Sequence, residues 1–170
     1  MYIEQISLLD EKIGGLDKEI QHRAKTDEGT SRLMTISGVG RMCATPLQAF
    51  SPQMEAFANG LECAAWCGLL PRQKPTSGRQ ILCQTRPNFA KLCRVSKMGR
   101  RDSRRLLITG SMAVMRRAIR KGPAIGAWLA KMLAGKRRML VATALANKLT
   151  RTVWALTTRK DVNQIPPLAA

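Results

Sequence analysis

Two glycines that flank a valine, followed at once by an arginine, are the residues of this sequence best suited to hold a phosphate group. The segment is Gly38-Val39-Gly40-Arg41, and the apolar positions around it have the offsets of a helix-hairpin-helix: Leu33, Ile36, Ala44 and Leu47. The glycines permit a tight turn, and the free N–H groups and dipole of a helix that starts near Arg41 attract phosphate. An ordinary tight helical hairpin without a ligand is the alternative. Pro46 falls inside the second predicted helix, where it removes a hydrogen bond.

Charge is divided unevenly along the chain. The net charge is +18 over 170 residues, but residues 1–30 sum to −3 and residues 31–170 to +21. A body with that excess repels itself unless a polyanion screens it, and each contact with a nucleic-acid phosphate also releases a counterion. An anionic membrane surface is the competing partner, but no basic amphipathic helix with a Trp/Phe face stands out. We therefore expect nucleic acid as the partner, and no membrane.

The residues that we expect to contact DNA lie in the glycine turn, in a long basic loop, and around the starts of two later helices. They are Gly38, Gly40, Arg41, Arg72, Arg79, Lys97, Arg100, Arg101, Arg104, Arg105, Lys136, Arg137 and Arg138. We expect these residues to contact the phosphates of DNA. Such contacts position a protein on DNA but do not recognise its sequence.

The five cysteines are an odd number and form no Cys-x-x-Cys pair. A zinc site made of Cys63, Cys67, Cys83 and Cys93 is conceivable, but their spacing matches no common pattern. We expect no metal in this chain and reduced thiols in a cytoplasm.

The composition predicts a mainly α fold. Apolar residues make up 45% and aromatics only 4%, which is typical of packed helices rather than of a sandwich. We expect a helical, coiled-coil-like arm over 1–30, a compact helical domain with a helix-hairpin-helix and a long basic loop over 31–160, and a disordered tail over 161–170. Residues 25–32 are predicted to be a loop. After the hairpin, helices are predicted over 59–69, 100–121, 124–134 and 139–158, and a small β-hairpin is conceivable within 79–95.

The arm carries an apolar stripe at steps of three and four, formed by Ile3, Ile6, Leu9, Ile13, Leu16 and Ile20. Gly14 and Gly15 weaken the middle of this helix. Two interpretations stay open: a short coiled-coil arm, for which three heptads is the lower limit, or a helix docked on the body.

Five segments in a fixed order carry a resemblance to a known family. They are Thr35-Ile36-Ser37-Gly38-Val39-Gly40, then Ala64-Ala65-Trp66-Cys67-Gly68-Leu69-Leu70-Pro71-Arg72-Gln73, then Val95-Ser96-Lys97-Met98-Gly99-Arg100-Arg101-Asp102, then Arg104-Arg105-Leu106-Leu107-Ile108, and Ala144-Leu145-Ala146-Asn147-Lys148-Leu149 with Trp154-Ala155-Leu156. Over about residues 5–160 the chain resembles the C-terminal transposase domain of the DEDD-type insertion-sequence transposases. This is the insertion-sequence one-ten family, which includes the pilin-gene invertases.

The resemblance implies a larger machine. Its complete members begin with a RuvC-like domain that carries four metal-binding carboxylates, continue with a coiled-coil arm, and act as oligomers on DNA with an element-encoded guide RNA. The acids of residues 31–170 are scattered and cannot form such a cluster: Glu55, Glu62, Asp102 and Asp161. We therefore expect a truncated chain that holds no cofactor, because the divalent metal belongs to the missing domain, and that does not cleave or join DNA alone.

The family also has a serine nucleophile in its C-terminal domain, just after the segment that matches Leu69 to Gln73. In this sequence Pro75 stands where the first serine is usual, and a one-residue shift lets Ser77 take that place. The resemblance therefore makes Ser77 the candidate catalytic residue. An ordinary loop serine beside Gly78 is the alternative.

Three functions follow from these observations. The first is a DNA-binding part of a transposase, cytoplasmic and associated with the bacterial nucleoid, with DNA and guide RNA as partners. The second is a free-standing, non-enzymatic helix-hairpin-helix module that binds nucleic acid. The third is a regulator that assembles with itself or with full-length transposases through the arm over 3–24.

Overall fold

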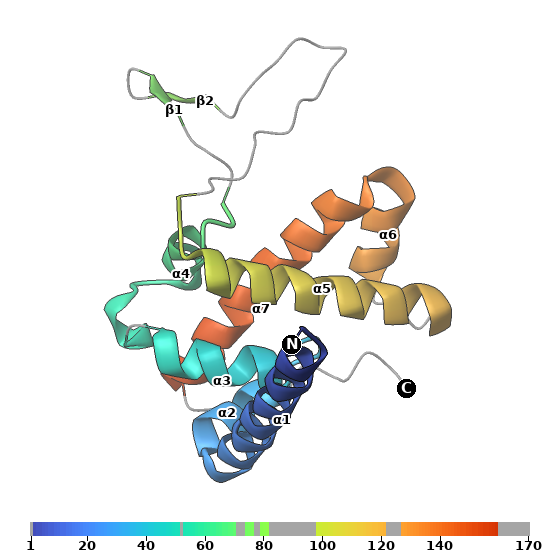
Figure 1. The fold of residues 1–170 in the computed structure, drawn as a ribbon. Coiled ribbons are helices and arrows are strands. Elements are labelled where there is room, and N and C mark those ends of the chain that lie inside the picture. The colour runs from blue at the N-terminus through green and yellow to red at the C-terminus, as the bar shows by residue number, and fades with distance from the viewer. Residues whose placement is uncertain are drawn as a thin grey trace.

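The fold is mainly α, as the composition predicts. A computed structural model describes residues 2–51, 53–70, 74–76, 79–81, 98–121 and 127–159, with side chains left undescribed over 74–76 and 79–81 and at 121 and 127. Figure 1 shows a group of crossing helices. In these residues the helices are α1 (Tyr2–Thr26), α2 (Glu28–Met34), α3 (Arg41–Phe50), the short 3-10 helix η1 (Met54–Ala56), α4 (Gly60–Trp66), α5 (Arg101–Lys121), α6 (Ala127–Gly135) and α7 (Arg138–Arg159).

Helix α7 is the centre of the packing. Helices α2, α4, α5 and α6 all contact it, and α5 crosses it in Figure 1. The helix predicted over 139–158 is confirmed, and its apolar stripe is buried throughout: Val141, Leu145, Leu149, Val153 and Leu156. Leu149, Val153 and Leu156 join the cluster formed by α2, α3 and α4, whereas Val141 and Leu145 join the one shared with α5 and α6.

Helix α5 has a glycine where it meets the turn that precedes α3. A Cβ added at Gly110 would lie 2.1 Å from the carbonyl oxygen of Gly38, which leaves no room for any side chain. Gly38 has φ +97°, and a Cβ there would lie 2.6 Å from Cγ2 of Val114. The glycine turn is thus pressed against the middle of α5, and two glycines permit this approach of backbone to backbone.

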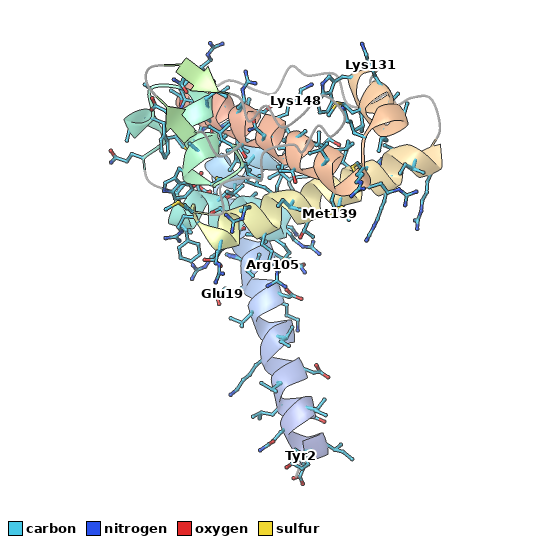
Figure 2. All side chains as sticks on the ribbon, turned by 90° about the horizontal axis from the view of Figure 1, so that it is seen from above. Tyr2, Glu19, Arg105, Lys131, Met139 and Lys148 are labelled. Atoms are coloured by element: carbon cyan, nitrogen blue, oxygen red, sulfur yellow. The ribbon has the colours of Figure 1, made fainter. Side chains whose placement is uncertain are left out.

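The arm differs from the prediction at its base. Residues 25–32 were predicted as a loop, and this is wrong, because α1 continues to Thr26 and α2 begins at Glu28. Asp27 separates them as the N-cap, and its carboxylate accepts a hydrogen bond from the amide of Thr30 at 2.8 Å. A single capping aspartate starts a new helix within what composition alone indicates is a polar loop. Figure 2 shows α1 projecting from the body, with Tyr2 at its far end.

Beyond the hairpin the predicted helices are observed with shifted ends. Asn59 caps α4 by accepting from the amides of Leu61 and Glu62. The small β-hairpin lies earlier than 79–95, because β1 (Lys74–Thr76) pairs antiparallel with β2 (Arg79–Ile81). Residues 82–95 and the predicted tail over 161–170 lie outside the described residues.

Candidate nucleic-acid interface

The turn from residue 35 to residue 40 leads into α3 without a side-chain cap. Gly40 is the N-cap of α3, and its carbonyl accepts hydrogen bonds from Cys43 and Ala44, both at 2.8 Å. No side chain caps the first amides of α3. Such amides attract an anion, and Gly40 and Arg41 beside them are both exposed. Pro46 lies inside α3, as predicted, in a helix of ten residues.

The two glycines of this turn have different tasks. Gly38 lies against Gly110 and Val114, so its lack of a side chain is required by packing. Gly40 has φ −83°, and a Cβ added there would meet nothing within 4 Å. A Cβ therefore fits at Gly40 but not at Gly38, which lies in the packing against α5.

Four arginines gather at the start of α5, as the sequence predicts. Arg100, Arg101 and Arg105 are exposed, and Arg104 is half-buried. Cations at a helix N-terminus oppose the helix dipole, and Asp102 is the acid of this first turn. The arginines therefore do not stabilise the helix end on which they stand. Arginines and helix N-terminal amides are groups that attract anions.

Arg100 is held in place by aromatic rings. Its guanidinium lies 5.9 Å from the ring centroids of both Phe50 and Trp66, within range of cation–π attraction. Its amide donates to the carbonyl oxygen of Trp66 at 3.0 Å. Trp66 in turn packs on Phe57, with ring centroids 6.0 Å apart. Sequence reasoning noticed Trp66 but missed Phe50, which is far from Arg100 along the chain.

The connector between α6 and α7 forms a second basic group. Lys136, Arg137 and Arg138 are exposed, and the carbonyl of Arg137 accepts from Leu140 and Val141 as α7 begins. Cations again stand at a helix N-terminus. Cations at this end are unfavourable for the helix dipole. As at the start of α5, they favour an anion as the partner.

The cations of these two groups form no ion pair with an acid in the part of the chain that the structure describes. The ion pairs of α1 and α2 join Arg23 with Glu19 and Arg32 with Glu28, away from both groups. Nη1 of Arg104 is shielded from solvent and finds no hydrogen-bond acceptor among the described residues. Arg101 and Arg105 are thus exposed cations of α5 without an acidic partner among the described residues.

Some predicted site residues lie outside the described residues. These are Ser77, Arg72 and Lys97, and for Arg79 only the backbone in β2 is described. The structure does show the two points of the helical body between which this segment runs. Gly68, with φ +68°, ends α4 as the amides of Gly68 and Leu69 bond to Ala65 and Ala64, a Schellman motif.

Gly68 and Gly99 lie against one another at the C-terminal end of α4. A Cβ added at Gly99 would lie 2.3 Å from the amide nitrogen of Gly68, so the two glycines are in close contact. The residues between them therefore start and end at the same point beside α5. Gly99 was absent from the predicted site, although its position in a Lys-x-Gly segment beside the basic helix was a signal that could have found it.

Two of the three cysteines among the described residues have raised pKa values, whereas the hydrogen bond with Cys67 lowers the pKa of Cys63. Cys43, Cys63 and Cys67 are buried free thiols. Burial raises the pKa of Cys43 to about 11, and the hydrogen bond with Cys63, followed by burial, raises the pKa of Cys67. Both thiols therefore stay protonated at neutral pH, which is not the state of a metal ligand or nucleophile.

Two further classes of site are absent from the described residues. No helix there is long and apolar enough to cross a membrane. No three His, Cys, Asp or Glu side chains there are grouped to hold a metal ion. The acids Glu55, Glu62 and Asp102 stand on three different elements, so they do not fit the divalent-metal site that the family resemblance implies.

Comparison with known proteins identifies the family of this chain. A family model described as the "Transposase IS116/IS110/IS902 family" matches residues 30–125, which include the glycine turn and the whole of α5. The chain belongs to this transposase family.

Relatives of this transposase-family chain share its sequence over most of its length. It is 34% identical over 92% of its residues to a "Probable family 20 transposase" of Pseudomonas aeruginosa. It is 30% identical to the transposases for insertion sequence elements IS1111A of Coxiella burnetii and IS1328 of Yersinia enterocolitica, over 89% and 91% of its residues. The chain spans 44%, 39% and 43% of these three relatives' lengths.

Proposed function

We propose that this chain is the DNA-binding C-terminal part of an insertion-sequence transposase, and that it takes part in DNA transposition and recombination without cleaving DNA by itself. One observation carries the proposal. The body over residues 31–170 has a net charge of +21. Six of its described arginines stand at the starts of α5 and α7: Arg100, Arg101, Arg104, Arg105, Arg137 and Arg138. An anion that binds there meets both guanidinium groups and free backbone amides.

The glycine turn supplies a third phosphate contact in this proposal. The amides of Arg41 and Met42 begin α3 without a side-chain cap, and Gly40 lets a phosphate approach them. Replacement of Gly40 by Val is the clean test, because the added side chain meets open space in the folded protein. We expect Gly40→Val to fold and to bind DNA more weakly. Unchanged affinity would contradict a phosphate-binding helix-hairpin-helix.

The main experiment is binding of the purified chain to a duplex of about 30 base pairs and to a structured RNA across a salt series. Replacement of Arg101 and Arg105 together by Ala should lower the salt slope by about 0.9 for each phosphate that is no longer neutralised. The matched control is Lys18→Ala with Lys25→Ala, which removes two exposed cations from the arm and should leave the slope unchanged.

The outcomes separate the candidate functions. Steep salt dependence with the expected decrease at α5 supports the proposal. Tighter binding to structured RNA than to DNA assigns the basic groups to a guide RNA. If both double variants change the slope equally, net charge alone governs binding and no defined interface exists.

Ser77 is our candidate nucleophile in the assembled transposase. It requires activation by a base or a metal, and the single histidine, His22, stands on exposed α1. The chain alone should not nick supercoiled plasmid in the presence of Mg²⁺. A nick that depends on Ser77, tested with Ser77→Ala, would show that the chain is catalytic by itself.

Self-assembly through α1 is part of the proposal. Ile6, Leu9, Ile13, Leu16 and Ile20 alternate in steps of three and four, which places Ile at every a position and Leu at every d position of a heptad. This choice favours two parallel strands. All but Ile20 are more than half exposed, from 56% to 59%.

Charges beside this seam agree with a parallel pair. Lys12 at a g position would face Asp17 at the e position of a second copy, which pairs opposite charges. We expect Leu9→Asp to abolish self-association in sedimentation or light scattering. Leu8→Asp is the control, since Leu8 is equally exposed at 53% but lies off the seam. Equal effects of the two changes would contradict the coiled coil.

A further inference from the structure

Trp128 on α6 is exposed in a way that the other described tryptophans are not. It is 40% exposed, while its neighbour Leu129 is 4% exposed and fixes the helix to the core. Trp66 and Trp154 both pack against the main core cluster, and the indole N–H of Trp154 donates to the carbonyl of Met54 at 3.1 Å. No hydrogen bond joins the indole of Trp128 to another described residue.

A cation lies over this exposed ring. Nζ of Lys148 on α7 is 5.1 Å from the ring centroid of Trp128. Lys131 stands three residues after Trp128 on the same helix, a spacing that brings two side chains to one face. In Figure 2 Lys131 and Lys148 lie toward the edge of the body away from the projecting arm, whereas Met139 and Arg105 lie toward the arm's side.

We propose that Trp128, flanked by Lys131 and Lys148, is a stacking platform for an unpaired base of a single-stranded nucleic acid. This inference rests on the proposed nucleic-acid binding. It adds a site for single-stranded nucleic acid to the sites proposed for duplex DNA. Its ligand is a base with a free π-face, attached to a phosphate that either lysine can contact.

Charge selects the occupant of this surface. Residues 127–159 contain seven Lys and Arg and no Asp or Glu, so an anionic partner is favoured over an apolar or basic one. Contact between Lys148 and the ring does not block the site, because a flexible lysine can leave an exposed ring for a phosphate.

Geometry selects the single strand over the duplex. Bases within a duplex are already stacked on both faces, so an indole on a helix surface cannot stack on them without opening the helix. An unpaired base offers its face freely, and stacking on aromatic side chains is tolerant of sequence. The exposed indole therefore adds nothing to duplex binding, for which the arginines at α5 and α7 suffice.

The test uses the full chain with three probes: a short oligothymidine, the same backbone with its bases removed, and the duplex used above. The normal chain should bind oligothymidine more tightly than the abasic backbone, with quenching of tryptophan fluorescence. Trp128→Ala should weaken oligothymidine binding roughly 5- to 150-fold and erase the preference over the abasic strand. Duplex affinity should stay the same.

Two further variants keep the result interpretable. Trp128→Phe should retain most of the preference, because a smaller aromatic face remains. Met139→Ala, which truncates an exposed apolar residue on the arm's side of the body, should change nothing. Equal binding of oligothymidine and abasic strand by the normal chain would overturn the platform, while salt-steep duplex binding would leave the proposed function standing. Failure to bind any of the three probes would overturn both.

Discussion

The arm and the body are built from the same kind of helix but differ in what covers them. In α1 the apolar stripe is open to solvent, with Ile3 80% and Leu9 56% exposed. In α5 the corresponding positions are closed, with Leu107 1% and Val114 8% exposed. A three-and-four periodicity therefore predicts a stripe in both helices. Whether that stripe is buried depends on whether other helices of the same chain pack against it.

The two regions also differ in how their charges are balanced. The arm holds acids and bases in one helix, and Arg23 pairs with Glu19 one turn away. The body has six arginines at the starts of α5 and α7, where the dipole opposes them, besides those at the C-terminal end of α5, where the dipole favours them. The arm thus mixes both signs of charge and keeps a small net charge of −3, while the body has a net charge of +21 that favours an anionic partner outside the chain. Four sets of changes test this division by comparing positions in the two regions and at their junction.

The largest effect is expected from Gly110→Val in the body. The added Cβ would lie 2.1 Å from the carbonyl oxygen of Gly38, so α5 and the glycine turn must separate. We expect loss of cooperative folding, or a cost above about 4 kcal/mol, measured by thermal and urea denaturation. Wild-type stability in this variant would show that the turn and α5 do not pack in solution.

Truncation of one leucine in each region comes next. Leu107→Ala should lower the free energy of unfolding by about 2–5 kcal/mol, because it leaves a cavity in the core. Leu9→Ala should change the monomer's stability by less than about 0.5 kcal/mol. A cost at Leu9 that grows with protein concentration would indicate that the arm is buried in an oligomer.

Asp27, at the junction of arm and body, should have a smaller effect that depends on pH. Hydrogen bonds from the Thr30 hydroxyl and then from its amide lower the pKa of this carboxyl. Its contribution is therefore complete above the unfolded pKa of about 3.9 and is lost as pH falls through the lower folded pKa. Asp27→Ala should cost about 0.5–2 kcal/mol at neutral pH.

A urea denaturation series from neutral pH to well below the unfolded pKa checks this prediction. The gap between Asp27→Ala and the normal protein should shrink toward the acid end. A gap that stays constant with pH would mean that the charge of Asp27 plays no part in the cap.

The smallest effect is a gain in the arm. Gly14 and Gly15 meet nothing within 4 Å where a Cβ would be, and they occupy the b and c positions, off the proposed seam. Each change to Ala should stabilise the helix by about 0.5–1 kcal/mol, seen as added helicity in circular dichroism. Reduced helicity would show that these glycines contact something in solution.

Much of the fold could be predicted because its signals are local. The stripes of α5 and α7, the turn at Gly38 and the helix start at Arg41 all follow from periodicity and from the special backbone of glycine. The loop predicted over 25–32 was wrong because a capping aspartate starts a helix that has no stripe of its own. The hairpin was placed too late because Lys74-Pro75-Thr76 has little strand character apart from its pairing with β2.

The candidate site was predicted only in its charged parts. The arginines at α5 and the connector before α7 stand out as runs of like residues. Arg100 between Phe50 and Trp66, and Lys148 over Trp128, did not, because each pair joins residues that lie far apart in the chain and no local pattern links them.

The sequence by itself determined that this protein is a helical, strongly basic member of a transposase family with an acidic amphipathic arm. Composition, periodicity and motif order can be seen in the sequence, and they do not depend on knowing which remote residues are in contact. Three features were decided only by the tertiary structure. Gly38 packs against α5, Gly68 is in contact with Gly99, and the ring of Trp128 is exposed with the ammonium group of Lys148 above it. These are facts of distance between remote segments, and only the packing of helices around α7 sets them.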